Sequence, residues 1–352
     1  MGFYYMHILK IVFVIIGTLI GAGFASGQEI FLFFFSYGLK GLLGILISSI
    51  VMGFIIYKTF MICNRYNPKN YKEFLNIIIK GKSRKKQFNL NTIIDLIINI
   101  FILITFFIMI AGFGAYFEQE LGINSLIGSC FLTALCFVVF MTSTNGVIKV
   151  NEIITPILIS FLIFIGFINI KTVNILNLRD YIIQINTKSW FMSGLLYASY
   201  NSILLIPVLI TLRDYIKNRK QIIAISTITS IIIMVLSVIV FLILVKVDVD
   251  ITKLEMPAVY VISNMIKGVS LAYGFIILGS IFTTSISLGT SFLQNVTKNK
   301  KSYTQIAVIM CITSILISKI GFSNLVNLLY PIFGYLGLLQ ILKISIEKIR
   351  KN

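Results

Sequence analysis

The feature that most constrains the fold is a series of apolar segments, most of them about 20 residues long, separated by short polar clusters. Each segment is long enough to cross a hydrocarbon core of about 30 Å. In lipid the backbone must satisfy its own hydrogen bonds, which leaves helices or a closed β-barrel. The segment Ile231 to Val245 is apolar on nearly every side, interrupted only by Ser237, instead of alternating with period two. We therefore predict an all-α integral membrane protein with about ten transmembrane helices.

The distribution of basic residues predicts which connections between the spans face the cytoplasm. Only 12% of the 352 residues are charged, yet the net charge is +18. If the N-terminus is cytoplasmic, every second connection and the C-terminal tail are rich in basic residues, as the positive-inside rule requires. We predict a multi-pass protein of the bacterial cytoplasmic membrane with both termini in the cytoplasm. Because loops explain the charge, the expected surroundings are the lipid bilayer, and no nucleic-acid partner is expected. The predicted spans are about 8–36, 40–62, 91–115, 123–143, 150–170, 189–212, 221–246, 270–294, 303–319 and 324–342.

Two connections have a pattern of their own. A basic loop at about 64–90 is partly amphipathic, and its apolar side either lies on anionic lipid or belongs to a solvated loop. The segment 247–267 is too short to span after its acidic start, so we expect an external lid or a re-entrant turn. The apolar residues of the basic loop are Tyr71, Phe74, Leu75 and Ile78.

The first span contains a glycine-rich stretch that weakens its helix. Gly17, Gly21, Gly23 and Gly27 lie within eleven positions, and each costs about 1 kcal/mol relative to alanine in a helix. Small residues spaced by four also favour helix–helix packing, which is the alternative explanation. Packing does not explain Glu29, because a glutamate inside a bilayer marks a functional site or an ion pair by default. We predict an unwound, solute-binding segment made of Gly21, Ala22, Gly23, Phe24, Ala25, Ser26, Gly27 and Glu29.

A second interruption is predicted in the sixth span, where Ser193 to Ser202 is rich in small and polar residues and Pro207 follows. Proline removes a backbone donor and disturbs the turn before it. The first and sixth spans each open a set of five, and paired interruptions indicate an inverted-repeat transporter. We expect halves at about 1–170 and 188–342 within one transmembrane domain, 1–352. The second interruption adds to the solute site Tyr197, Ser199, Tyr200, Asn201 and Ser202.

The eighth span carries neighbouring hydroxyl groups in the stretch Ser280 to Ser285. Hydroxyl and carbonyl oxygens are hard ligands that suit small cations such as Na⁺. Serine and threonine also bond to the carbonyls of their own helix, and this simpler explanation stays open.

The stretch Gly17 to Glu29, followed by a Phe-rich run and Gly38, Gly41 and Gly44, resembles the first two spans of YkvI-type bacterial membrane proteins. These belong to the amino acid–polyamine–organocation superfamily, and the resemblance extends over essentially the whole chain. It implies the five-plus-five inverted repeat of the bacterial leucine transporter, with discontinuous first and sixth helices. It also implies a sodium site built from the carbonyls of Gly17, Ile20 and Ser280 and the hydroxyls of Thr283 and Thr284.

Together these features predict a cation-coupled secondary transporter of a small organic solute, with an amino acid as the expected solute. Na⁺ is the expected coupling ion, Glu29 leaves a proton-linked variant open, and no other cofactor is expected. Aromatic residues near Phe113 and Tyr116 are expected to cover the solute. The alternative is a solute-sensing receptor subunit of the same fold without net transport. An enzyme is not expected, because His7 is the single histidine and the spans hold no paired carboxylates. The sequence leaves the oligomeric state open.

Overall fold

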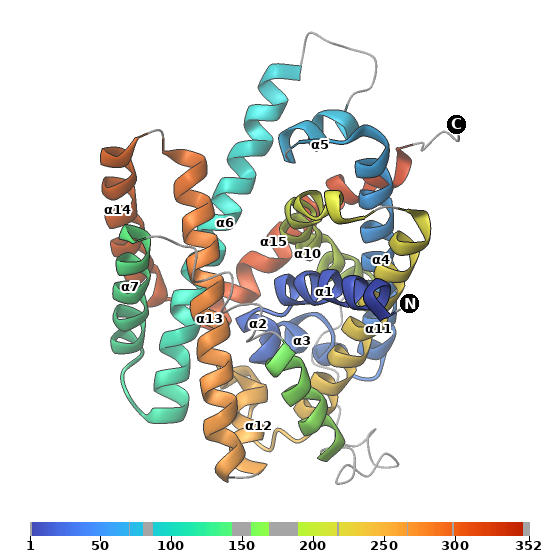
Figure 1. Ribbon diagram of the computed structural model, residues 1–352. Coiled ribbons are helices and arrows are strands. Elements are labelled where there is room, and N and C mark those ends of the chain that lie inside the picture. The colour runs from blue at the N-terminus through green and yellow to red at the C-terminus, as the bar shows by residue number, and fades with distance from the viewer. Residues whose placement is uncertain are drawn as a thin grey trace.

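The computed structural model describes residues 2–69, 71–79, 87–142, 156–168, 189–216, 218–265, 267–297 and 299–347. Within these ranges the chain is helical, with short 3₁₀ turns and no β-strand. Figure 1 shows long helices side by side, with shorter helices at the middle and at both ends of the bundle. The predicted boundary between the two halves, at 170–188, lies outside the described residues.

The helices follow the predicted spans to within a few residues. Seven of the described helices, namely α4, α6, α10, α11, α13, α14 and α15, are long and apolar enough to cross a membrane. Ile8–Leu19, Ser125–Met141 and Pro156–Ile168 are shorter apolar helices. The prediction of an all-α, multi-pass membrane protein is confirmed. The bounds are α1 (Gly2–Leu19), α2 (Ala22–Ala25), α3 (Gln28–Phe33), α4 (Lys40–Tyr66), α5 (Tyr71–Ile79), α6 (Gln87–Leu121), α7 (Ser125–Met141), α10 (Trp190–Thr211), α11 (Arg219–Leu244), α12 (Pro257–Met265), α13 (Lys267–Val296), α14 (Lys300–Ser318) and α15 (Phe322–Ile346), with the 3₁₀ turns η1 (Phe35–Tyr37), η3 (Arg213–Tyr215) and η4 (Ile251–Lys253).

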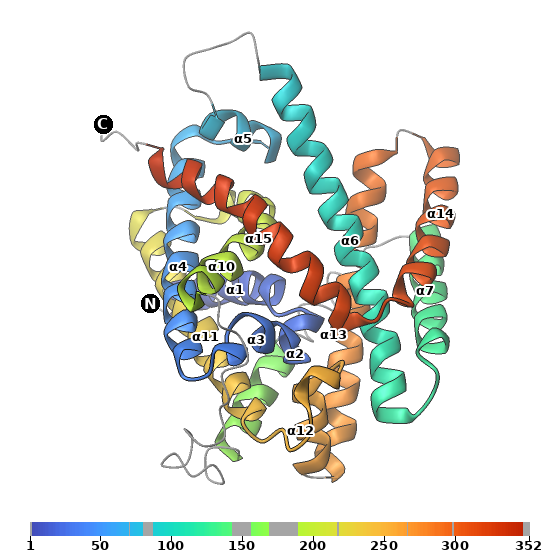
Figure 2. The same ribbon diagram turned by 180° about the vertical axis from the view of Figure 1, so that it is seen from behind.

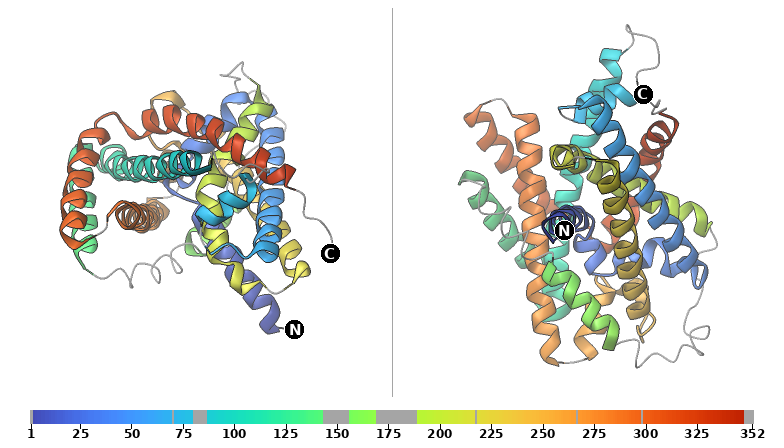
Figure 3. Two further views of the ribbon diagram at one scale, coloured as in Figure 1. Left: turned by 90° about the horizontal axis from the view of Figure 1, so that it is seen from above. Right: turned by 45° about the vertical axis from the view of Figure 1, so that its right-hand side comes forward.

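The first span is interrupted, as predicted, and it is interrupted twice. α1 ends at Leu19, and Gly21 is extended, with φ −94° and ψ −168°, before the single turn of α2. Gly27 is left-handed, with φ +83°, and starts α3. Glycine adopts this conformation without the steric cost that other residues incur. The outcome is three short helices in place of one, and α1 lies across the long axis of α13 (Figures 1 and 3).

The sixth span is not interrupted. α10 is one helix from Trp190 to Thr211 with Pro207 inside it, so the prediction of a discontinuous sixth helix is wrong. The polar side chains that suggested a break bond to the helix itself. The Ser199 hydroxyl donates to the Leu195 carbonyl (2.6 Å), the Ser202 hydroxyl to the Ser199 carbonyl (2.7 Å) and the Asn201 amide to the Tyr197 carbonyl (3.0 Å). Such local bonds are the ordinary use of these residue types in a helix.

α10 lies in the middle of the molecule, packed between α4 and α15 (Figure 2). α7 and α14 pack on each other and on α6 at one side, as the view from above shows (Figure 3). α10 also packs on α1 and α3, two pieces of the broken first span.

α5 lies across one end of the bundle (Figure 1). The sequence left lipid and solvent as alternatives for its apolar side, but that side is buried against α4, α10 and α15 instead. The backbone N–H of Lys69 donates to the Glu73 carboxylate in the first turn (2.7 Å). The basic stretch 80–86 lies outside the described residues. The buried side chains of α5 are Phe74, Leu75 and Ile78.

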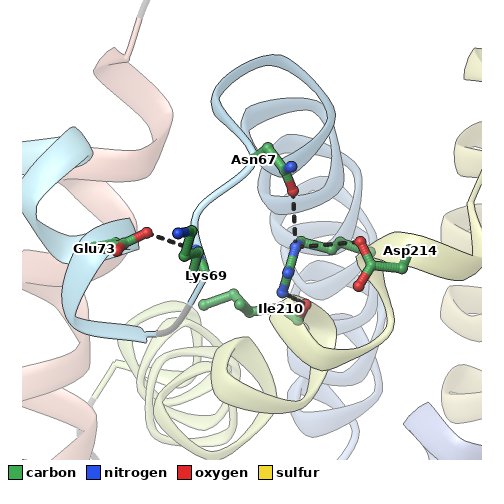
Figure 4. A network of polar contacts seen from close by, with 6 residues as sticks. Asn67, Lys69, Glu73, Ile210 and Asp214 are labelled. Carbon is green, nitrogen blue, oxygen red and sulfur yellow. Dashed lines mark hydrogen bonds and ion pairs between the residues drawn. The ribbon is translucent and has the colours of Figure 1, made fainter.

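Beside α5, Arg213 joins the ends of α4 and α10. Its guanidinium group donates to the Asn67 side chain (2.9 Å) and to the Ile210 carbonyl (3.1 Å), and lies 3.5 Å from the Asp214 carboxylate. Figure 4 shows Asn67, Ile210 and Asp214 gathered at this corner. A basic side chain on the last carbonyls of a helix is a favourable cap, so this end of α10 is held in place.

We predict that Gly27→Ala destabilises the protein while Gly21→Ala does not. A Cβ at Gly27 would lie 2.7 Å from the Ala258 Cβ and 3.0 Å from the Ala258 nitrogen, whereas one at Gly21 meets nothing within 4 Å. The left-handed conformation alone costs alanine about 1–2 kcal/mol, or about 2–8 °C in Tm. Thermal unfolding of the two purified variants measures this. Equal melting temperatures would contradict the described turn.

Candidate functional site

A cavity of about 560 Å³ lies between α1, α6, α10, α13 and α15. It brings together residues from all three segments that the sequence singled out. The predicted residues that line it are Gly17, Gly21, Glu29, Tyr200, Asn201 and Thr284. The other predicted residues are not part of its lining: Ile20, Ala22, Gly23, Phe24, Ala25, Ser26, Gly27, Tyr197, Ser199, Ser202, Ser280 and Thr283.

The cavity extends from the broken first span toward one end of the bundle. Its lining on α6 runs from Ile98 to Met109, on α10 from Tyr200 to Thr211 and on α13 from Thr284 to Ser291. The stretches of α10 and α13 belong to the helix halves that run toward the end where α5 lies (Figures 1 and 2). The charge pattern of the sequence predicts that this end is cytoplasmic.

Glu29 lies at the inner end of the cavity. Its side chain is 3% exposed, and one carboxylate oxygen accepts a hydrogen bond from the Tyr200 hydroxyl. The turn at Gly27 places Glu29 in the first turn of α3. Gly23 leaves the space, because a Cβ there would collide with the Glu29 carboxylate. No ion pair with a basic side chain is formed by Glu29 within the described ranges.

Aromatic rings surround this carboxylate. The Tyr200 ring stacks on Tyr330 with centroids 4.7 Å apart and on Phe33 at 5.4 Å, and Tyr197 meets it edge-on at 5.5 Å. A carboxylate in such an apolar setting is stable only if it takes a proton or meets a cation. The site can therefore hold a positive charge.

The broken first span also leaves backbone oxygens free. The Ile20 N–H still bonds to Ile16, but the next hydrogen bond along the backbone starts at Ala25, which donates to Gly21. Within the described residues, the carbonyls of Gly17 and Ile20 accept no hydrogen bond. These same two carbonyls were predicted from the sequence as the first-span ligands of Na⁺. Carbonyl oxygens without a hydrogen-bond partner suit a cation.

On α13, the Thr283 hydroxyl donates to the Ser280 carbonyl (3.1 Å), which is the local bond that the sequence left open. Thr284 lines the cavity together with Gly17. α13 packs closely on α2 and α6. The full set of sodium ligands stays a prediction.

The opposite end of the site is covered by α12. The Ala258 N–H donates to the Ser26 carbonyl (2.8 Å), and the Tyr273 hydroxyl of α13 donates to the Ala25 carbonyl. Both bonds satisfy carbonyls that the break in the first span frees. Ala25 and Ser26 are thus bonded to the segments that close this end.

Side chains around α12 hold it in place. Gln119 of α6 accepts from the Met256 N–H (2.9 Å) and donates to the Met256 carbonyl (3.0 Å). The Glu255 carboxylate accepts from the Ser323 N–H at the start of α15 (2.6 Å), where a negative charge is favoured. The Tyr260 hydroxyl donates to Asp248 (3.0 Å), and this bond raises the pKa of the Tyr260 phenol. We call these contacts the α12 closure.

Some lining residues were not predicted. Tyr330 comes from α15, and Phe101, Thr105 and Met109 come from α6. The only local signal was Pro331 after Tyr330, since a proline inside a helix marks a disturbed turn. Phe113 and Tyr116, expected to cover the solute, do not line the cavity.

Known proteins resemble this chain in sequence and in fold. No protein-family model matches it. It is 29% identical to the uncharacterized membrane protein YkvI of Bacillus subtilis, covering 94% of this chain and 92% of that protein. It is 24% identical to the uncharacterized protein YyaD of the same organism, covering 94% of each. A solved structure of a Na⁺-coupled sialic acid symporter, substrate-bound and outward-open, matches with a TM-score of 0.56 and 11% identity, over 94% of this chain and 76% of that one. The chain shares the fold of this symporter.

We predict that Gln119→Leu loosens the α12 closure. The change removes two hydrogen bonds to Met256, each worth about 1 kcal/mol, so the opened population rises about tenfold or more. A Ser26→Cys probe in a cysteine-free background reports the opening, because Ser26 is 0% exposed. Its rate of alkylation in detergent is expected to rise by that factor. Gln294→Leu, at an exposed position of α13, is the matched control, and equal rates in both variants would contradict the closure.

Proposed function

We propose that the protein is a cation-coupled secondary transporter of a small organic solute, working by alternating access, with amino acids as the first solute class to test. The observation that carries the proposal is the one-sided cavity. It reaches Glu29 and the broken first span from one end of the bundle, while the α12 closure covers the other end. Alternating access requires such states, each open to one side. The described state is open toward the predicted cytoplasmic side.

The fold likeness supports the proposal in a second way. The similar symporter is coupled to Na⁺ and was solved outward-open. With the predicted topology, the cavity of this chain would open to the opposite side. We also propose the amino acid–polyamine–organocation superfamily as the wider group. Free carbonyls at Gly17 and Ile20 and the Thr284 hydroxyl would serve Na⁺, while Glu29 would serve a proton.

Uptake into proteoliposomes tests coupling directly. A thermal-shift screen against amino acids and related amines first finds a solute, because a ligand stabilises the fold increasingly as its concentration rises above its Kd. Uptake of that labelled solute is expected to fall at least tenfold when Na⁺ is replaced by choline. A factor of ten corresponds to a contribution of about 1.4 kcal/mol from the coupling ion to solute binding. Uptake that ignores both Na⁺ and pH would contradict the coupling. Saturable binding with no flux would favour the sensor instead.

We predict that Thr284→Ala weakens Na⁺ activation of uptake. Losing one ligand oxygen should raise the Na⁺ concentration at half-maximal uptake about tenfold, which corresponds to about 1.4 kcal/mol. Thr313→Ala is the matched control, since its hydroxyl bonds to the Ile309 carbonyl on α14, away from the cavity. If Na⁺ activates Thr284→Ala as it activates the unaltered protein, Thr284 is not a Na⁺ ligand. The hydroxyls of the eighth span would then only bond to carbonyls of their own helix.

A further inference from the structure

We propose that the cavity binds an organic ammonium ion and that Glu29 is its counter-ion, with no carboxylate required on the ligand. This inference rests on the proposed transport function and narrows its solute class. It follows from the charges, the unpartnered oxygen and the shape of the cavity.

The charge of the cavity has one sign. Among the described residues that line it, Glu29 is the only carboxylate, and none is lysine, arginine or histidine. A ligand anion would meet no basic side chain and would be repelled by the carboxylate. A ligand cation would remove the cost of a buried, unpaired charge.

The Glu29 carboxylate lines the cavity, and only one of its two oxygens has a hydrogen-bond partner among the described residues. One oxygen accepts from the Tyr200 hydroxyl, and the Oε1 atom lies over Gly23 with no hydrogen-bond partner among the described residues. An ammonium group carries donors that such an oxygen needs. The Tyr200 and Tyr330 rings line the same cavity and stack on each other, and aromatic faces attract ammonium ions.

The other lining residues determine which chemical character and size the rest of the ligand can have. Beyond Glu29 the wall on α6 and α10 is largely apolar, with Phe101, Ile102, Met109 and Leu204. A cavity of about 560 Å³ is in the ordinary range for a small ligand. The complementary ligand is an ammonium head on an apolar or aromatic body of modest size.

Three compounds with one body test the inference: phenethylammonium, phenylalanine and 3-phenylpropionate. Their affinities for the purified full-length protein are measured by titration calorimetry at fixed Na⁺. Phenethylammonium is expected to bind at least tenfold more tightly than phenylpropionate. Glu29→Gln is expected to lose at least tenfold of the phenethylammonium affinity, and Glu29→Asp, which keeps the charge, to retain more of it. Glu118→Gln removes an exposed carboxylate of α6 and is expected to bind like the unaltered protein.

Several results would overturn the inference. They are equal affinity for phenethylammonium and phenylpropionate, at least tenfold tighter binding of phenylalanine than of phenethylammonium, no binding of any of the three, or a Glu29→Gln variant that melts normally and binds phenethylammonium unchanged. Loss of Na⁺ dependence in Glu29→Gln with unchanged ammonium affinity would also overturn it, by assigning the carboxylate to the coupling ion. Flux measurements separate the two proposals. Ammonium binding without flux contradicts transport alone, whereas coupled uptake of another solute without ammonium binding contradicts this inference alone.

Discussion

A helix that is broken inside a membrane must have its freed backbone groups satisfied by the protein, because lipid offers no hydrogen bonds. Most of this structure follows from that requirement. The carbonyls of Ala25 and Ser26 are taken by the Tyr273 hydroxyl and the Ala258 N–H. α12 lies outside the long helices but bonds directly to the break. The carbonyls of Gly17 and Ile20 keep no such partner among the described residues, so the break is satisfied on one side and open on the other.

The second constraint is the charge next to the break. Glu29 could not be buried at 3% exposure without the space over Gly23 and the Tyr200 hydroxyl. A phenol shares the charge but does not neutralise it, so the carboxylate still needs a proton, a metal ion or an ammonium. Since a single carboxylate holds one such partner at a time, binding of one changes the preference for the others.

The sequence predicted what depends on length and on local backbone chemistry. The spans follow from apolar length. The break in the first span follows from its glycines, because glycine adopts φ +83° at Gly27 without the steric cost of other residues. The prediction of a break in α10 was wrong. The side chains of Ser199, Asn201 and Ser202 bond to carbonyls within a continuous helix as readily as to those of an unwound segment. Tyr330 could not be found, since its place beside Tyr200 depends on how α15 crosses α10. The apolar side of α5 likewise could not be assigned to protein without knowing its neighbours.

The α12 closure has few hydrogen bonds, which act together with the buried side chains of Ala258, Val259 and Ile262. Two bonds from Gln119, one from Glu255 and one from Ala258 to Ser26 amount to a few kcal/mol at about 1 kcal/mol each. When α12 moves away, water from the outer side can take its place at the Ser26 carbonyl, so opening does not strand a buried group. Under the proposed alternating access, the Ser26 carbonyl of the break would therefore keep a hydrogen-bond partner in both states.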